Sequence, residues 1–126
     1  MKKIITLAAL AVSLGLTVTG QAFAHGAKPQ HGGVVKSVND ITFELVSKDG
    51  KAVIYVDDHG QQKATAGASA TLTVLSGKTK SQTVLAAAGT NELVSKDDVK
   101  LSAGSKAVAS ISFPDKPAMS VRFAVK

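Results

Sequence analysis

The stretch DITFELVSKDGKAVIYVDD, residues 40–58, contains two runs of alternating apolar and polar side chains joined by a turn signal. In the first run Ile41, Phe43 and Leu45 alternate with polar residues, and KAVIYVDD continues with the same period of two. This period, together with many β-branched residues, is typical of half-buried strands. Lys48-Asp49-Gly50, between the two runs, is a turn signal. The stretch therefore predicts two neighbouring antiparallel strands.

The same pattern recurs along the rest of the chain. ATLTVLS (70–76), KAVASISF (106–113) and MSVRFAVK (119–126) are strand-like, and turn signals separate the strands at short intervals. No segment has a sustained period of 3.6 residues. About seven or eight short strands predict an all-β fold, a single antiparallel β-sandwich of immunoglobulin-like type over residues 34–126. The residues expected in or beside its core are Phe43, Tyr55, Leu72, Val74, Ile111 and Phe123.

One short sequence occurs twice. ELVSKDG at 44–50 recurs as ELVSKDD at 92–98, but the residues on either side do not align. A duplicated structural unit would extend the similarity in both directions. We therefore interpret the two copies as strand-to-turn junctions that are alike.

Residues 1–24 have the features of a secretory signal peptide. Two lysines form a positive start, an apolar run follows, and Ala22-Phe23-Ala24 has the small-x-small pattern of a cleavage site. The apolar run is too short for a membrane span. We expect cleavage after Ala24, a periplasmic protein that begins at His25, and no stable membrane insertion after processing. Residues 25–33 are polar, with glycine and one proline, and predict a flexible N-terminal arm.

The composition excludes several classes of function. The chain has no cysteine, which rules out disulfides and thiolate metal sites. Its 15 Lys and Arg outnumber 9 Asp and Glu, but the positive charges are scattered. Nucleic-acid binding needs clustered positive charge, usually with aromatic residues that stack on bases, and only 4% of this chain is aromatic. We therefore expect no nucleic-acid partner.

Catalytic motifs are nearly absent, and we expect no enzyme activity. SGKTK (76–80) resembles the end of a phosphate-binding loop, but Leu72 stands where that motif needs a glycine. No serine lies in a G-x-S-x-G pattern. An oxidative copper enzyme built on an N-terminal histidine ranks last among the hypotheses. Such enzymes need an exposed aromatic surface, and this chain has 1 Tyr and no Trp.

The three histidines, His25, His31 and His59, carry most of the chemical information. After cleavage, the α-amine and ring Nδ1 of His25 would form a six-membered chelate, which suits Cu(II) because that ion prefers nitrogen donors in a tetragonal plane. His31 follows closely in the arm and would supply a third nitrogen. His59 lies in a predicted turn and would be the fourth nitrogen donor. Asp57 or Asp58 would add an oxygen or hold this imidazole through its other nitrogen, with Asp58 as the candidate ligand.

The spacing of the histidines is equally compatible with a protein whose histidines bind no metal. Three histidines are an ordinary number for a chain of this length, and DDHG (57–60) makes a good turn without any ion. The preference for Cu(II) follows from the general affinity order, so Zn(II), Ni(II) or another divalent transition metal stays open.

HGGVV (31–35), FELV (43–46), VIYVDDHG (53–60), TAGASATLTVLSG (65–77) and the closing VRFAVK occur in this order. Together they resemble a family of small bacterial periplasmic proteins related to a domain of heavy-metal efflux adaptors, which serve the pumps that expel copper, silver, cobalt, zinc or cadmium. The resemblance covers nearly all of the chain after residue 24. It implies a β-sandwich and a role near metal efflux, and its histidine positions correspond to His31 and His59. Relatives often have a histidine just before the ELV strand, where this chain has Thr42 and Phe43. This departure implies weak or transferable binding.

The resulting hypothesis is a periplasmic metal-binding protein, in the first place for copper, that carries or buffers ions beside a heavy-metal efflux or resistance system. Its partners would be the metal ion and an efflux adaptor. The alternative is a metal-free β-sandwich interaction module that docks onto an envelope complex. Ordering of residues 25–33 by metal would separate the two.

Overall fold

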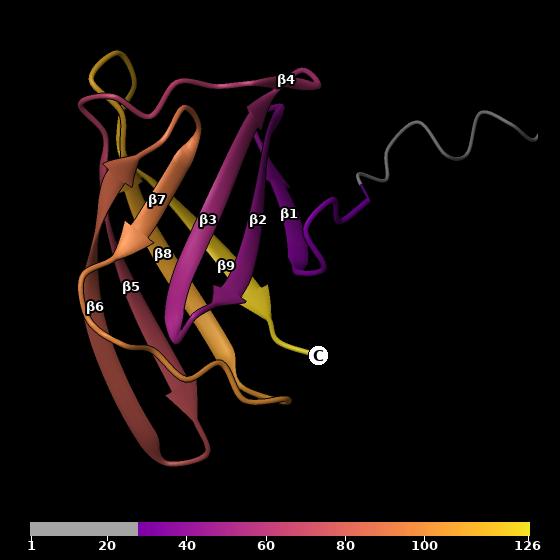
Figure 1. Cartoon of the computed structure of the whole chain (residues 1–126), viewed down its shortest axis with the longest axis vertical. Helices are drawn as coiled ribbons and strands as arrows, with labels where there is room; N and C mark the ends of the chain where they lie inside the picture. The colour runs from indigo at the N-terminus through magenta and orange to yellow at the C-terminus, as the bar shows by residue number, and fades with distance from the viewer. Residues whose placement is uncertain (1–27) are drawn as a thin grey trace, which may run out of the picture.

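The computed structural model describes residues 28–126, which form strands joined by turns and short loops (Figure 1). In this part of the chain no helix is long and apolar enough to cross a membrane. The predicted signal peptide and His25 lie outside the described residues. The strands are β1 (Val34–Val38), β2 (Ile41–Lys48), β3 (Lys51–Asp58), β4 (Gln61–Gln62), β5 (Ser69–Ser76), β6 (Thr79–Ala88), β7 (Glu92–Ser95), β8 (Lys106–Ser112) and β9 (Met119–Ala124).

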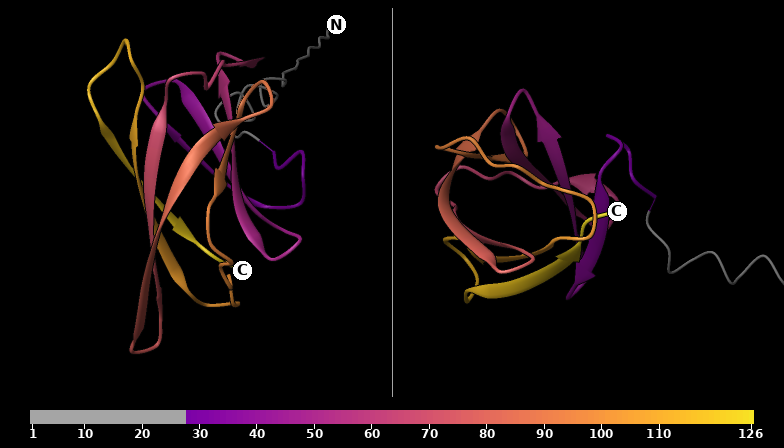
Figure 2. Two further views of the ribbon diagram at one scale, coloured as in Figure 1. Left: turned by 60° about the vertical axis from the view of Figure 1, so that its left-hand side comes forward. Right: turned by 90° about the horizontal axis from the view of Figure 1, so that it is seen from below.

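All of these strands belong to one antiparallel sheet, in the order β1-β2-β3-β7-β6-β5-β8-β9, with the short β4 paired to β3. The sheet curls until its two ends, β1 and β9, lie next to each other, and it nearly closes into a barrel (Figure 2). The predicted all-β antiparallel fold is confirmed. The immunoglobulin-like expectation is refined, because β7 pairs with both β3 and β6 and so joins faces that a sandwich keeps in separate sheets.

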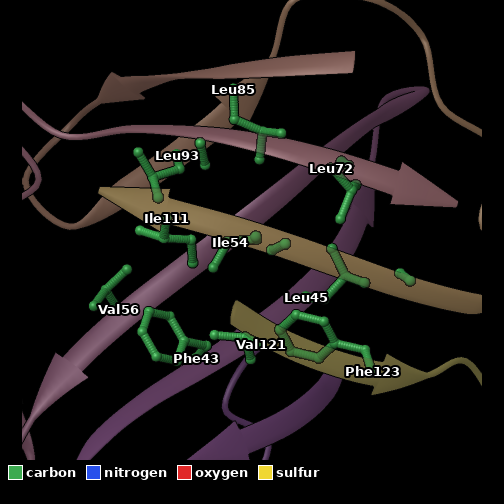
Figure 3. Close-up of a cluster of buried hydrophobic side chains, with 14 of the residues drawn as sticks. Phe43, Leu45, Ile54, Val56, Leu72, Leu85, Leu93, Ile111, Val121 and Phe123 are labelled. Atoms are coloured by element: carbon green, nitrogen blue, oxygen red, sulfur yellow. The ribbon is translucent and has the colours of Figure 1, made fainter. Parts of the chain in front are cut away.

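The core lies inside the curled sheet. The two-residue period of each strand turns one set of side chains inward, and Figure 3 shows them converging from opposite walls of the barrel. Tyr55, by contrast, is half-buried on the outer face of β3, out of phase with its inward neighbours Ile54 and Val56. The other residues predicted for the core are buried: Phe43, Leu72, Val74, Ile111 and Phe123.

The two ELVS sequences occupy equivalent places on either side of β3. Both β2 and β7 run antiparallel to β3, and Glu44 and Glu92 both pair with Tyr55. The leucine that follows each glutamate is buried and pairs with Ile54. The copies are alike because each strand presents a leucine to the same part of the core and a glutamate to the same outer face.

Replacing Phe43 with alanine tests this packing. Phe43 is 0% exposed, and its loss should lower the free energy of unfolding by about 3–5 kcal/mol, because it removes a buried ring and leaves a cavity. Urea unfolding followed by far-ultraviolet circular dichroism measures the change. Val84→Ala is the matched control: this side chain is 48% exposed, and its loss should cost less than about 1 kcal/mol. Equal losses in the two variants would contradict the core described here.

Candidate functional site

A buried carboxylate organises the N-terminal edge of the sheet. Glu44 lies on the outer face of β2, yet it is only 5% exposed. Its oxygens accept hydrogen bonds from three backbone N–H groups, those of Gln30 (3.0 Å), His31 (2.8 Å) and Gly33 (2.9 Å). Residues 30–33, part of the arm predicted to be flexible, are therefore held against the sheet by one side chain.

Glycine at position 33 is required by the close approach of this segment to β2. A Cβ atom built on Gly33 would lie 2.2 Å from the carbonyl oxygen of Leu45 and 2.8 Å from Cγ2 of Val46. No side chain fits at such distances. The preceding Gly32 has a φ of +77°, a conformation that glycine adopts at little cost. The pair of glycines in HGG thus lets the chain turn and then lie close enough to reach Glu44.

His31 is fixed by two contacts. Its Nδ1 lies 3.0 Å from Oε1 of Glu44. Its ring stacks on that of Tyr55, with centroids 3.6 Å apart and planes inclined by 4°. Tyr55 pairs directly with Glu44 across β2 and β3, so one cross-strand pair supplies both contacts. The His31 side chain is still 38% exposed, and it makes no Nε2 hydrogen bond to residues 28–126.

The protonation state of Glu44 determines which tautomer His31 adopts. Burial raises the pKa of Glu44, but hydrogen bonds from the Gly33 N–H, the His31 ring and the N–H groups of Gln30 and His31 outweigh that effect, and the pKa lies below its usual value of 4.5. The carboxylate is therefore ionised at neutral pH and can only accept hydrogen bonds. Nδ1 of His31 carries the hydrogen, and the lone pair of the neutral ring is on Nε2.

A shallow hollow of about 130 Å³ lies beside the His31 ring. Among the residues that line it are Thr42, Tyr55, Asp57 and Gly60. Asp57 lies on the same outer face of β3 as Tyr55, two residues further along the strand. The lining thus contains one imidazole, two carboxylate residues and two hydroxyl residues, which are donors that a divalent ion accepts, and one lysine, Lys28.

His59 and Asp58 lie at the adjacent turn and interact with each other. His59 has a φ of +52° and its side chain is 73% exposed. Its Nδ1 bonds to a carboxylate oxygen of Asp58, and its Nε2 lies 3.8 Å from Oδ2 of Asp40. Neither His59 nor Asp58 lines the hollow beside His31. Within residues 28–126, no three His, Asp or Glu side chains are grouped so as to hold a metal ion.

Sequence reasoning identified His31 but missed its two partners. Glu44 falls on the polar side of the DITFELV alternation, where a solvated glutamate is the ordinary expectation. Tyr55 was expected to be in or beside the core, whereas its ring lies on the outer face under His31. The available signal was HGG itself, because two successive glycines beside a histidine indicate a close backbone approach.

Comparison with known proteins adds no assignment, since no protein-family model, curated protein or solved structure matches this chain.

Substitution of Glu44 tests whether this carboxylate anchors the segment before β1. Glu44→Gln should lower the free energy of unfolding at pH 7 by about 1.5–3 kcal/mol, because the hydrogen bonds lose a charged acceptor. The pKa of Glu44 is lower in the folded chain than its usual value of 4.5, so its stabilising effect is full above that pH and is lost as the pH falls through the folded pKa. The difference between the two proteins should therefore shrink on acidification.

Glu92→Gln is the matched control for this measurement. Glu92 pairs with Tyr55 from the opposite strand, and its carboxylate makes no hydrogen bond to the described part of the chain. Urea unfolding at neutral and acidic pH should show little difference between Glu92→Gln and wild type. The anchoring role of Glu44 is wrong if the two variants lose the same stability at pH 7.

Proposed function

We propose that this chain is a periplasmic metal-binding protein for copper, which carries or buffers Cu(II) beside a heavy-metal efflux or resistance system. The observation that carries the proposal is the hydrogen bond between Glu44 and Nδ1 of His31. A carboxylate behind a histidine orients the ring and raises the basicity of its other nitrogen, an arrangement common at metal-ligating histidines. Here that other nitrogen is Nε2, on a ring that lines the hollow.

His31 would be the anchoring ligand. The stack on Tyr55 and the bond to Glu44 hold its ring in place before any ion arrives, so binding requires little ordering of this side chain. After cleavage, the amine and ring of His25 would add nitrogen donors from nearby in the chain. Asp57 would offer an oxygen from the hollow. A site with one fixed ligand and others on a chain end exchanges ligands stepwise, which suits transfer to a partner.

We propose His59 and Asp58 as a separate and weaker point of contact. Their side chains bond to each other outside the hollow. An ion there would have to displace that contact. Loss of His59 should therefore leave binding at His31 intact, and His59→Ala serves as a matched control for His31→Ala.

Fluorescence of the tyrosine provides a direct assay. Tyr55 is the 1 Tyr of a chain without Trp, and its ring lies 3.6 Å from the His31 ring, so a Cu(II) ion bound to His31 should quench its emission. One equivalent of Cu(II) should bind wild type. His31→Ala should weaken binding at least about tenfold and Glu44→Gln by about 10–100-fold, because the second variant removes the carboxylate that orients the ring. His59→Ala should retain the quenching.

Protonation should release the ion. Every nitrogen ligand must be deprotonated to bind, so affinity should fall as the pH drops through about 6.5 and below. The proposal fails if wild type and His31→Ala bind Cu(II) with equal affinity and equal quenching. Zn(II) titrated in the same way tests the preference for copper.

Mass spectrometry of the exported protein tests the part of the proposal that depends on processing. The mature chain should begin at His25 and carry one Cu(II). A chain that begins at another residue removes the amine chelate, while binding at His31 stays testable by the fluorescence assay.

A further inference from the structure

The β5–β6 hairpin extends beyond the other strands at one end of the barrel (Figure 1 and Figure 2). β7 pairs with β6 only over residues 85–88, so the half of β6 nearer the turn has no strand on that side. The turn itself is Gly77-Lys78, and Gly77 has a φ of +61°. The end of the hairpin is therefore open to whatever surrounds the protein.

Leu75 lies near this end, on the outer face of the sheet and between two cations. Its side chain is 46% exposed. It pairs directly with Lys80 of β6 on one side and with Lys106 of β8 on the other. Directly paired residues of antiparallel strands have their side chains on the same face. One exposed leucine is therefore flanked by a lysine on each side, and all three side chains point outward.

Arg122 extends this group onto β9. It pairs with Val108, which lies two residues after Lys106 on β8 and therefore faces the same way. Lys78 adds a cation at the turn. We call the following five residues the hairpin patch: Leu75, Lys78, Lys80, Lys106 and Arg122.

No ion pair neutralises the cations of the hairpin patch. All four are exposed, and within residues 28–126 the lysines that pair with carboxylates are Lys51 and Lys63. β5, β6, β8 and β9 contain no Asp or Glu. Asp97 does bond to β6, but its partner Thr83 is buried opposite Leu72, on the inward-facing side. Cations gathered in this way repel each other, and a negatively charged surface would relieve that repulsion.

The shape of the hairpin patch favours a flat surface over a peptide. β5 has hydrogen-bonded strands on both sides, so Leu75 lies on a sheet face where no further strand can add. The sheet curls around the core, which makes its outer face convex (Figure 2). A bilayer of anionic lipids offers phosphate groups to the cations and an apolar layer to the leucine between them. Lysine suits this position because its apolar stem can lie along that layer while its charge stays among the headgroups.

We propose that the hairpin patch binds the surface of an anionic phospholipid bilayer. Leu75 enters the interface, and the surrounding lysines and Arg122 bind lipid phosphates. The contact is peripheral and spans no membrane. It is independent of metal binding at His31, because it uses a different surface of the barrel.

Co-sedimentation with vesicles of phosphatidylglycerol and phosphatidylcholine tests the charge contacts. The exported protein is used, because the apolar run of the expected signal peptide would itself bind lipid. About 0.1 M salt screens charges more than about 10 Å from the lipid. Lys106→Glu should weaken binding at least about fivefold, since an attraction to phosphate becomes a repulsion. Circular dichroism establishes that this variant and its control are folded.

Lys116→Glu is the matched control for Lys106→Glu. It makes the same change in net charge, but Lys106 begins β8 and Lys116 follows the other end of that strand. Binding of the control should stay within about twofold of wild type, because its charge is screened from the lipid.

Leu75→Ser tests the apolar contact. It should weaken vesicle binding at least about threefold, because the leucine no longer enters the interface. Val84→Ser is its matched control: this side chain is 48% exposed and pairs with Thr71, four residues before Leu75 on β5. Binding of Val84→Ser should stay within about twofold of wild type.

Four outcomes contradict the proposal. Equal weakening by Lys106→Glu and Lys116→Glu overturns it in favour of general charge attraction. Equal binding to vesicles of phosphatidylcholine alone shows that the cations play no part. An effect of Leu75→Ser no larger than that of Val84→Ser removes Leu75 from the interface. Binding of a glutamate-rich peptide through Lys106, without binding to the vesicles, overturns it in favour of an acidic protein partner.

Discussion

Glu44 is a charged group held out of water on a face of the sheet that would otherwise be solvated, and the candidate site depends on that burial. An isolated buried carboxylate is costly, so it persists only when hydrogen bonds replace its hydration. Three backbone N–H groups and one imidazole do so here. The same bonds hold the chain before β1 against β2, fix the tautomer of His31, and place its ring on Tyr55. The stability of this edge and the chemistry of the proposed metal ligand thus share one cause.

β3 lies between β2 and β7, the two strands that carry the ELVS sequence. β2 and β7 pair with it in the same register, and their glutamates flank Tyr55. Residues 30–33, just before β1, donate hydrogen bonds to Glu44. The sheet neighbour of β7 on the corresponding side is β6, and no such segment bonds to the Glu92 carboxylate in residues 28–126. Identical local sequences therefore end in different environments: one glutamate is a buried acceptor and the other is a half-buried surface group.

Charged side chains are unevenly distributed over the strands. The carboxylates that lie in strands belong to β2, β3 and β7, near His31 and the hollow beside it. β1, β5, β6, β8 and β9 carry lysine or arginine, or no charge, and contain no Asp or Glu. This division is a property of the strand order, because the charges come from segments far apart in the sequence.

Local sequence determined the strands and the side of each strand that is buried. Alternation in DITFELV and ATLTVLS is a short-range property, and the positions of Phe43, Leu72 and Phe123 in the core follow from it. The two glycines that follow His31 likewise indicate a close approach of the backbone. Which segments approach each other depends on contacts between parts of the chain that are far apart in the sequence. The union of all strands in one curled sheet, the burial of Glu44, the stack of His31 on Tyr55, and the separation of His59 from that pair arise from contacts between distant segments. Alternation alone does not encode them, because a polar position in a strand has the same pattern whether water or another part of the chain covers it.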